Sequence, residues 1–306
     1  MLPLMRKRKL NLATATVAIT GSTGGIGDAL ATALVKRGTK VACLDLDPER
    51  TAEQARRLGR NGCAVGCGID VRDQRSLERA LQKSRAQLGP INAVIAGAAV
   101  SSGVDPFETA RADDWENTID INLHGIWRTF KAGLPYVDET KGHLMAISSL
   151  AAFVPVPFMS AYSPSKAAIW ALCNTLRLEL EPRGITVGSA HPPFIRTPMT
   201  EPLLVDAAMV RLTNNFSGVW EFAKLDKVVE DITRGLRRRD AHVITPRKLY
   251  PVAKAPGLFR PLIEYRAYKG NAIGQAMTIA LARNAPTINH NTTINHDTTV
   301  LRSNRE

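Results

Sequence analysis

The sequence is poor in cysteine and in aromatic residues. Its four cysteines among 306 residues are Cys43, Cys63, Cys67 and Cys173. A structural zinc site usually needs four well-spaced ligands, so we expect no metal site and interpret the cysteines as small apolar residues of a reducing compartment. Aromatic residues form 6% of the chain and do not interleave with basic residues. Nucleic acid is therefore disfavoured as a partner, because the base-stacking pattern of its binders is missing.

The sequence also lacks an uninterrupted apolar stretch of membrane-spanning length. Residues 142–165 carry no formal charge, but Pro155, Pro157, Pro164 and several serines interrupt them. A spanning helix needs roughly 20 mostly apolar residues. The basic N-terminal residues are not followed by the apolar run of a signal peptide. We therefore expect a cytoplasmic protein.

Acidic residues are outnumbered by basic ones, 28 to 40, and the formal net charge is +12. Arg6–Lys9 opens the chain with four basic residues. Further basic residues crowd the last third: Arg237–Arg239, Arg247, Lys248, Lys254, Arg260, Arg266 and Lys269. Such a charge describes partners and solubility rather than fold. It fits either an ordinary basic surface or attraction to an anionic partner, such as a membrane surface or a phosphorylated ligand.

Apolar runs and helical patterns alternate along most of the chain. Strands are predicted at residues 17–20, 40–45, 64–69, 91–96, 143–148 and 185–190, and helices at 26–34, 48–60, 77–88, 113–135 and 160–182. This alternation indicates βαβ units, because parallel strands need crossover connections. We therefore predict an α/β fold, a single doubly wound Rossmann-type parallel sheet with helices on both faces, plus a C-terminal extension.

These patterns divide the chain into four segments. Residues 1–12 form a basic N-terminal lead, residues 13–250 the α/β domain, and residues 251–284 an apolar and basic extension. Residues 285–306 are polar and contain the tandem hexapeptides TINHNT and TINHDT. That composition is typical of a disordered tail.

A glycine-rich turn, Thr20–Gly27, has the sequence TGSTGGIG and links the first predicted strand to the first helix. Glycines there let the backbone approach a pyrophosphate closely, and the following helix offers free N–H groups and a favourable dipole. A glycine-rich turn alone is a weak signal. Its position after the first strand makes it a candidate dinucleotide phosphate site.

Acidic residues follow the next two predicted strands. Asp45 ends the second strand, where a carboxylate can accept hydrogen bonds from both ribose hydroxyls of the adenosine half and repels a 2′-phosphate. Leu46 follows it, and no basic residue lies within the glycine turn. Both features favour NAD, with NADP as the alternative cofactor and Asp47 as an alternative ribose partner. Asp70 and Val71, after the third strand, are candidate adenine contacts.

Tyr162 and Lys166 form the most informative pair in the sequence. On a helix, residues i and i+4 share a face, so both side chains point to the same place. A nearby ammonium group favours the phenolate and lowers the tyrosine pKa from about 10 toward working pH. Ser149 follows a predicted strand and lies at the crevice where α/β sheets bind ligands. Asn122, amid apolar residues, is interpreted either as a satisfied core amide or as part of a water-holding backbone kink.

Together these motifs resemble the short-chain dehydrogenase/reductase family over roughly residues 13–250. The likeness rests on the order and spacing of TGSTGGIG, Asp45, Asp70-Val71, Asn122, Ser149 and the pentad YSPSK at Tyr162–Lys166. The resemblance implies an NAD(P)-dependent oxidoreductase that interconverts a secondary alcohol and a ketone, with hydride transfer to or from nicotinamide. It also implies a homodimer or a homotetramer.

The resemblance assigns a role to each candidate catalytic residue. Tyr162 is the general acid/base for the substrate oxygen, Ser149 holds that oxygen, and Asn122 holds a water of a proton relay. Lys166 lowers the pKa of Tyr162 and binds the nicotinamide ribose. The implied cofactor contacts are Gly21, Ser22, Thr23, Gly25, Ile26, Gly27, Asp45, Asp70, Val71, Ala98, Tyr162, Lys166, Pro192 and Thr197.

Three positions depart from the family pattern. Ala96–Ala99 replaces the usual NNAG after the fourth strand, Pro192-Pro193 replaces PG after the sixth, and His191 stands where Asn is common. Proline has neither the freedom of glycine nor an N–H to donate. These departures leave a second hypothesis open, a non-catalytic dinucleotide sensor on the same fold, although a sensor does not need both Tyr162 and Lys166.

Apolar residues flank the candidate catalytic pair. Residues 153–159 lie between Ser149 and Tyr162 and must border the site, and Phe194 with residues 198–222 is expected to cover it. Such a wall suits a hydrophobic alcohol or ketone of lipid, steroid or terpenoid type, unless it is the ordinary packing of an apolar loop. The basic segment 250–284 has three interpretations: a membrane-surface contact, a cover over the cleft, or a subunit contact.

Overall fold

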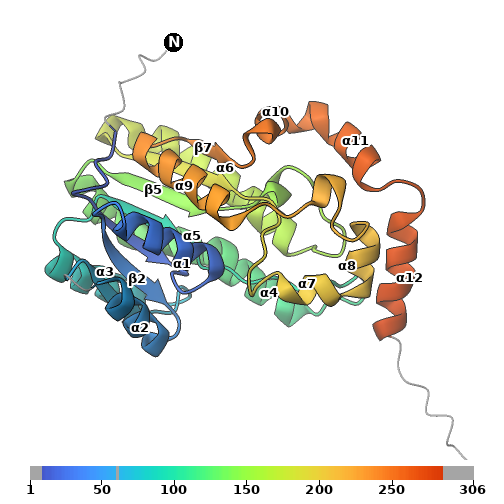
Figure 1. The fold of residues 1–306 in the computed structure, drawn as a ribbon, viewed down its shortest axis with the longest axis horizontal. Helices are drawn as coiled ribbons and strands as arrows, with labels where there is room; N and C mark the ends of the chain where they lie inside the picture. The colour runs from blue at the N-terminus through green and yellow to red at the C-terminus, as the bar shows by residue number, and fades with distance from the viewer. Residues whose placement is uncertain (1–8, 60–61, 285–306) are drawn as a thin grey trace, which may run out of the picture.

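The computed structural model describes residues 9–59 and 62–284, in which seven strands form one parallel sheet (Figure 1). The strands are β1 (Thr16–Thr20), β2 (Lys40–Asp45), β3 (Ala64–Gly68), β4 (Ala93–Ala96), β5 (His143–Ile147), β6 (Thr186–His191) and β7 (His242–Ile244). Their order is β3-β2-β1-β4-β5-β6-β7, and every neighbouring pair is parallel. The order reverses between β1 and β4, the switch point at which doubly wound sheets bind ligands.

Helices cover both faces of this sheet. They are α1 (Gly25–Val35), α2 (Pro48–Leu58), α3 (Gln74–Leu88), α4 (Ala112–Ile119), α5 (Gly125–Glu139), α6 (Tyr162–Leu180), α7 (Glu201–Val205), α8 (Ala207–Leu212) and α9 (Leu225–Arg238). Helices α3, α5 and α6 pack on one face, and α1 and α9 pack on the other (Figure 1). Every residue of β1, β4 and β5 is buried, as parallel strands covered on both faces require. The predicted doubly wound sheet is confirmed.

The structure differs from the predicted elements at one interrupted helix and at elements that the prediction lacks, among them β7 and α9. The predicted helix 113–135 is interrupted, because α4 ends at Ile119 and residues Asp120–His124 form a π-helical turn before α5. A single wide turn leaves the apolar periodicity almost unchanged, so the sequence does not reveal it. Strand β7 is also absent from the prediction, since its three residues are too few to form a recognisable apolar run.

The end of the predicted N-terminal lead belongs to the packed domain. Leu10 and Leu12 are buried in the cluster that also holds residues of α1 and α9. The Leu10 N–H donates to the Arg237 carbonyl oxygen over 2.8 Å. A boundary at residue 12 therefore does not separate lead from core. The predictions for residues 1–8 and for the tail 285–306 lie outside the described residues.

The C-terminal extension forms three helices, α10 (Tyr250–Lys254), α11 (Pro256–Ala267) and α12 (Ala272–Asn284). Ala276 and Ala280 of α12 are fully buried in a cluster shared with α8. The Tyr268 hydroxyl, between α11 and α12, donates to the Pro155 carbonyl oxygen over 2.8 Å. The extension thus packs against the loop that follows β5. Of the helices in residues 9–59 and 62–284, none has the length and hydropathy to cross a membrane.

Candidate active site

The candidate residues meet at the carboxyl ends of the central strands, next to the switch point between β1 and β4. There a cavity of about 570 Å³ is lined by the glycine turn, by the ends of several strands and by the start of α6. Of the predicted cofactor contacts it brings together Gly21, Thr23, Gly25, Ile26, Gly27, Asp45, Asp70, Val71, Ala98, Tyr162, Lys166, Pro192 and Thr197. Ser149 lines the same cavity.

The glycine turn is packed so closely that a Cβ atom at three of its glycines would overlap neighbouring atoms. Gly21 has a φ of +71°, and a Cβ there would lie 2.7 Å from the backbone of Ala98. A Cβ at Gly25 would lie 2.6 Å from the Thr197 side chain, and one at Gly27 would overlap the Gly21 carbonyl oxygen. Helix α1 begins at Gly25, and its first N–H groups are free for a ligand. The turn therefore fits the pyrophosphate of a dinucleotide.

Ser22 is not among the residues that line this cavity, and its role as a cofactor contact stays a prediction. Its side chain is fully buried, and its hydroxyl donates to the Gln54 Oε1 atom over 2.9 Å. Its N–H donates to the Leu44 carbonyl oxygen over 3.2 Å, and Gln54 Nε2 donates to the Ser22 carbonyl oxygen over 2.7 Å. Ser22 thus anchors the glycine turn to α2 and β2.

Asp45 faces the glycine turn from the end of β2. Its Oδ2 atom accepts hydrogen bonds from the N–H and the hydroxyl of Thr23, both over 2.8 Å. Arg50 lines the same cavity from α2 and donates from Nη2 to the Thr23 carbonyl oxygen over 3.2 Å. The sequence does not reveal Arg50 as a site residue, because the first turn of α2 is what brings it to the cavity. A carboxylate, Asp45, and a guanidinium group, Arg50, therefore lie at the same end of the candidate cofactor site.

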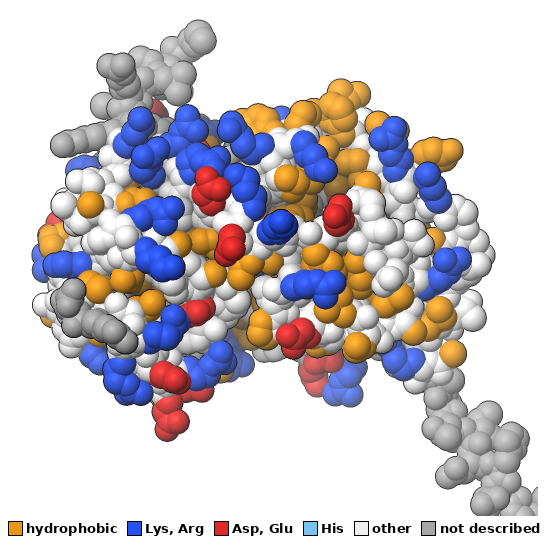
Figure 2. Space-filling view, viewed as in Figure 1, with side chains coloured by type: hydrophobic (Ala, Val, Ile, Leu, Met, Phe, Trp, Pro, Cys, Tyr) orange, Lys and Arg blue, Asp and Glu red, His pale blue; other side chains and the backbone are white. Residues whose placement is uncertain are grey.

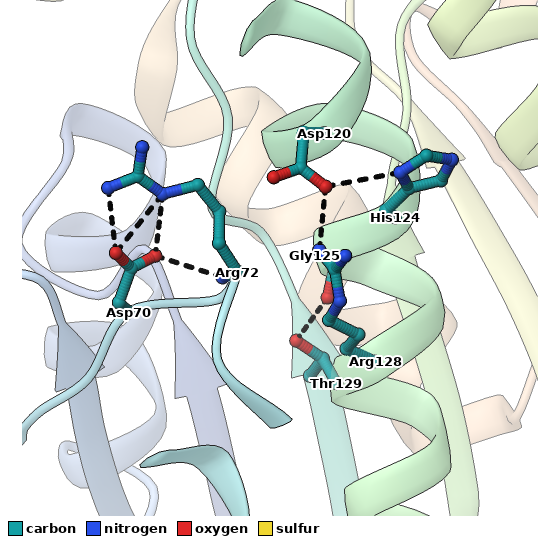
Figure 3. A network of polar contacts seen from close by, with 7 residues as sticks. All are labelled: Asp70, Arg72, Asp120, His124, Gly125, Arg128 and Thr129. Carbon is teal, nitrogen blue, oxygen red and sulfur yellow. Dashed lines mark hydrogen bonds and ion pairs between the residues drawn. The ribbon is translucent and has the colours of Figure 1, made fainter. Parts of the chain in front are cut away.

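Asp70, the predicted adenine contact, is held by Arg72 (Figure 3). The Arg72 Nε atom lies 3.0 and 3.1 Å from the two carboxylate oxygens, and Nη2 lies 2.7 Å from Oδ2. These hydrogen bonds hold the pKa of Asp70 below its usual value, against the effect of burial. Both side chains line the cavity. Asp70 therefore meets a ligand as part of an ion pair rather than as a free carboxylate.

Tyr162 and Lys166 lie one turn apart at the start of α6, as their spacing predicts. The Lys166 Nζ atom lies 5.3 Å from the centroid of the Tyr162 ring and donates to the Ile147 carbonyl oxygen over 3.2 Å. The Ser148 hydroxyl donates to the Lys166 carbonyl oxygen over 2.9 Å. These two bonds tie α6 to the end of β5, from which Ser149 follows.

The surroundings of this pair control its protonation. Desolvation raises the pKa of Tyr162 above its ordinary value of 10.0, and a hydrogen bond with the Ser149 side chain partly offsets that rise. Desolvation lowers the pKa of Lys166 from 10.5 to about 8. The lowering contribution comes from Ser149, and the expected effect of Lys166 on the pKa of Tyr162 stays a prediction. At neutral pH the tyrosine is a neutral phenol and the lysine is mostly an ammonium ion.

Asn122 lies on the π-helical turn and is fully buried. Its Oδ1 atom accepts from the Val100 N–H over 2.8 Å, and its Nδ2 atom donates to the Val100 carbonyl oxygen over 2.9 Å. Nδ2 also donates to Ser165 Oγ over 3.4 Å. Asn122 thus joins the loop after β4 to α6. The core-amide interpretation accounts for these contacts, and the water-holding role stays a prediction.

An ion pair braces the turn that carries Asn122 (Figure 3). Asp120 Oδ1 accepts from Arg128 Nη1 over 2.8 Å and lies 3.1 Å from His124 Nδ1. Arg128 belongs to α5, so the pair spans the junction between the turn and the helix. The Thr129 hydroxyl donates to the Gly125 carbonyl oxygen over 2.7 Å in the same region. These contacts fix the position of Asn122 relative to α5.

The departures from the family pattern support Ser149. His191 is fully buried, with Nδ1 3.1 Å from the Ser149 carbonyl oxygen and Nε2 2.8 Å from the Ser189 hydroxyl. Burial lowers the pKa of His191 to about 3, so the ring is neutral. The Leu150 N–H donates to the Pro192 carbonyl oxygen over 3.0 Å. His191 and Pro192 thus hold the loop of Ser149 and Leu150 against the end of β6, although proline replaces the glycine of the family pattern.

A second cavity, of about 470 Å³, shares Tyr162 and Ser149 with the first. Its wall is mostly apolar and includes Leu150, Ala151, Val154, Val156, Met159, Phe194, Met199, Leu203, Val219, Trp220 and Phe222. Phe194 packs edge-on against Phe216 and Trp220, with ring centroids 5.7 and 6.1 Å apart. The predicted cover by Phe194 and residues 198–222 is thus present. The sequence did not single out Leu249, Val252 and Ile263 of the C-terminal segment, which also line this cavity.

In the part of the chain that the structure describes, no group of three or more His, Cys, Asp or Glu side chains is placed to hold a metal ion.

The family model described as short chain dehydrogenase matches residues 15–207. The chain therefore belongs to the short-chain dehydrogenase/reductase family, and at the level of that family it is an oxidoreductase.

Two relatives show the extent of this likeness. The chain is similar to the oxidoreductase UcpA of Escherichia coli K12, with 33% identity over 190 residues that cover 61% of this chain and 72% of that protein. It is also similar to an uncharacterized oxidoreductase of Staphylococcus epidermidis, with 30% identity over 186 residues that cover 60% and 79% of the two chains.

Solved structures share the fold. A short-chain dehydrogenase/reductase from Burkholderia phymatum in complex with NAD superposes with a TM-score of 0.72 at 19% identity, covering 83% of this chain and 96% of that chain. A 3-ketoacyl-(acyl-carrier-protein) reductase from Brucella melitensis complexed with NADH gives a TM-score of 0.67 at 18% identity, covering 76% and 96%. At these identities the likeness is one of fold.

Proposed function

We propose that the protein interconverts a secondary alcohol and a ketone on an apolar substrate, with NAD as the hydride carrier. The observation that carries this proposal is the position of Tyr162 and Ser149, which line both the cavity of the glycine turn and the apolar cavity. A reacting carbon between the two cavities would lie next to both side chains. The structures with NAD and NADH that share the fold support the choice of cofactor.

Each residue has a stated task in this proposal. A bound nicotinamide supplies or accepts the hydride. The Tyr162 hydroxyl transfers the proton at the substrate oxygen, and as a neutral phenol at neutral pH it can donate to the oxygen of a ketone. Ser149 Oγ accepts the Ala151 N–H over 3.1 Å, and its O–H, which hydrogen-bonds Tyr162 in this structure, would turn to the substrate oxygen. The Lys166 ammonium, held at the Ile147 carbonyl oxygen, binds the nicotinamide ribose.

We propose a substrate of lipid, steroid or terpenoid type. The apolar cavity of about 470 Å³ has the size of a small-molecule site, for which about 300–1,000 Å³ is usual. Lys248 and Glu221 are the charged residues among its lining side chains. An apolar molecule with a single reactive oxygen would satisfy the wall and present that oxygen to Tyr162.

Purified protein is expected to reduce apolar ketones with NADH faster than hydroxylated ketones of the same size, because the cavity wall offers hydroxyl groups few partners. Cyclic and long-chain ketones and their hydroxylated analogues, followed by NADH absorbance, measure this preference. Val219→Asp places a charge in the cavity wall and should raise KM for the apolar ketones about fivefold or more. Val205→Asp, at a position 84% exposed and outside the cavity, is the matched control.

Rates that are independent of substrate polarity would contradict the apolar substrate class. Tight NAD binding without turnover of any ketone or alcohol would instead favour the dinucleotide sensor.

Asp45→Ser is expected to shift cofactor preference toward NADP. The substitution removes the carboxylate that repels a 2′-phosphate and leaves Arg50 at the same end of the cavity to pair with it. We expect the ratio of kcat/KM for NAD to that for NADP to fall at least about tenfold. Steady-state kinetics with both cofactors measure the ratio, and adding Arg50→Ala should remove part of the gain with NADP.

Asp47→Ser is the control for the alternative ribose partner. Asp47 caps α2, where its Oδ1 atom accepts from the N–H groups of Glu49 and Arg50 over 2.9 and 3.1 Å. Serine caps helices about as well as aspartate, so we expect this variant to keep both the stability and the cofactor preference of the native chain. If the ratio of kcat/KM for NAD to that for NADP changes in Asp47→Ser but not in Asp45→Ser, Asp47 rather than Asp45 binds the ribose.

We also propose that the active form is a homodimer or homotetramer in the cytoplasm. Trp115, Trp127 and Leu178, from α4, α5 and α6, are large apolar side chains that are 39%, 46% and 59% exposed. A second copy of the chain would cover them.

A further inference from the structure

Helix α11 carries apolar side chains on its outer side as well as its inner side. Ile263 lines the apolar cavity, whereas Leu258, Leu262 and Tyr265 are 74%, 50% and 76% exposed. Spacings of four and three residues place these three side chains in one stripe along the helix. A surface helix of a globular protein normally turns polar residues toward water. The stripe Leu258–Leu262–Tyr265 therefore lacks the polar surface that a helix without a partner would have.

Basic residues are frequent in the same segment. Six of them lie within residues 247–269 and all are exposed: Arg247, Lys248, Lys254, Arg260, Arg266 and Lys269. The segment has one acidic residue, Glu264, which lies beside Tyr268 and outside the stripe. Within residues 9–59 and 62–284, none of the six forms an ion pair. Figure 2 shows Lys and Arg side chains next to hydrophobic ones along the edge over α10 and α11.

We propose that this face, the stripe together with the exposed basic residues of the same segment, docks on the surface of an anionic lipid bilayer. Leucine side chains enter the boundary between headgroups and acyl chains, and tyrosine rings sit at headgroup level. Lysine and arginine side chains extend their apolar stems along the membrane and place their charges at the lipid phosphates. A second copy of this chain fits the face less well, because two such faces would bring like charges together.

The docking face belongs to the segment that covers the apolar cavity and lies on the outer side of that segment. Leu249, Val252 and Ile263, from the same segment, line that cavity from within. An apolar substrate dissolved in the bilayer would thus lie next to the wall of the cavity that receives it. This consequence rests on the proposed function, whereas the docking itself does not.

Vesicle flotation with the full chain tests the docking. We expect binding to vesicles of mixed phosphatidylcholine and phosphatidylglycerol at low salt. Binding to phosphatidylcholine alone, or at high salt, should be at least about tenfold weaker, because ionic attraction to the bilayer is then missing or screened. The triple variant Leu258→Ser/Leu262→Ser/Tyr265→Ser should bind the mixed vesicles at least about tenfold more weakly.

Phe107→Ser/Val205→Ser is the matched control, since these side chains are 82% and 84% exposed on other elements. The control should keep vesicle binding, and both variants should keep NAD binding and the circular dichroism of the native chain. Absence of binding to the mixed vesicles at low salt, or binding that survives the triple variant, overturns the proposal. If the triple variant has a lower solution mass than the native chain in the absence of lipid, the stripe binds a second copy of the chain, and the bilayer proposal is overturned too.

Flotation needs no turnover, so the two proposals fail separately. A protein that floats with the mixed vesicles but reduces no ketone supports the docking face and counts against the proposed activity. A protein that reduces apolar ketones but does not float keeps the activity and loses the docking face.

Discussion

Tyr162→Phe is expected to lower kcat for ketone reduction by about 10²- to 10⁴-fold, the usual contribution of a positioned general acid. The substitution removes one oxygen atom and keeps the ring that lies 5.3 Å from the Lys166 Nζ atom. The shape of the cofactor cavity is therefore preserved, and the Kd for NADH should change by less than about threefold. Steady-state turnover and a fluorescence titration with NADH measure the two effects separately.

Tyr136→Phe is the matched control for this variant. Tyr136 is a partly buried tyrosine of α5 that packs against the core cluster between α3, α5 and the sheet, away from both cavities. It should keep turnover and NADH affinity. If Tyr162→Phe retains kcat within about tenfold of the native protein, the phenol is not the general acid. If NADH affinity falls together with kcat, the hydroxyl also contributes to cofactor binding, and the loss of turnover does not isolate its role as general acid.

The cofactor side of the site follows from the sequence because parallel strands end at one edge of the sheet. Gly21 and Asp45 come at the ends of β1 and β2, which are neighbours, so their positions in the chain fix their meeting in space. Tyr162 and Lys166 need only a helix to share a face. These signals are local, and the structure places all four residues around the same cavity.

Ser22 and Arg50 show where such local signals fail. The direction of the Ser22 hydroxyl depends on Gln54, a partner 32 residues away, and nothing within the turn reveals that partner. Arg50 reaches the cavity because α2 begins at Pro48 and turns its first residues back toward Thr23. Both outcomes depend on how α2 packs, which periodicity alone does not give.

The substrate side is the least accessible part from sequence. Helix α11 has Ile263 toward the cavity and Leu258 and Leu262 toward the outside. A helix with apolar residues on both sides has no polar face by which the pattern could orient it. The three interpretations of residues 250–284 therefore remain equivalent until the packing is known. The structure shows that the segment covers the cleft, and it leaves the outer stripe for the bilayer proposed above.

Gly27→Ala is expected to raise the Kd for NAD by about tenfold to hundredfold, which corresponds to the usual cost of overpacking. The new Cβ would overlap the Gly21 carbonyl oxygen and lie 2.8 Å from the Ser22 Cα atom. Relief of that overlap must move the turn, because Ser22 is fixed by Gln54 from the other side. Calorimetric titration with NAD measures the affinity, and thermal unfolding shows how much of the native turn remains.

Gly24→Ala separates this effect from a general loss of glycine. A Cβ at Gly24 would lie 3.4 Å from the same Gly21 oxygen, which is ordinary van der Waals contact, and the backbone there has a φ of −73°. Alanine adopts that conformation readily, so the Kd for NAD should stay within about threefold of the native value. Gly24 and Gly27 line the same cavity. Native-like affinity for NAD in both variants would therefore mean that the pyrophosphate does not bind at this turn. A loss of affinity confined to Gly27→Ala locates the phosphates at the start of α1.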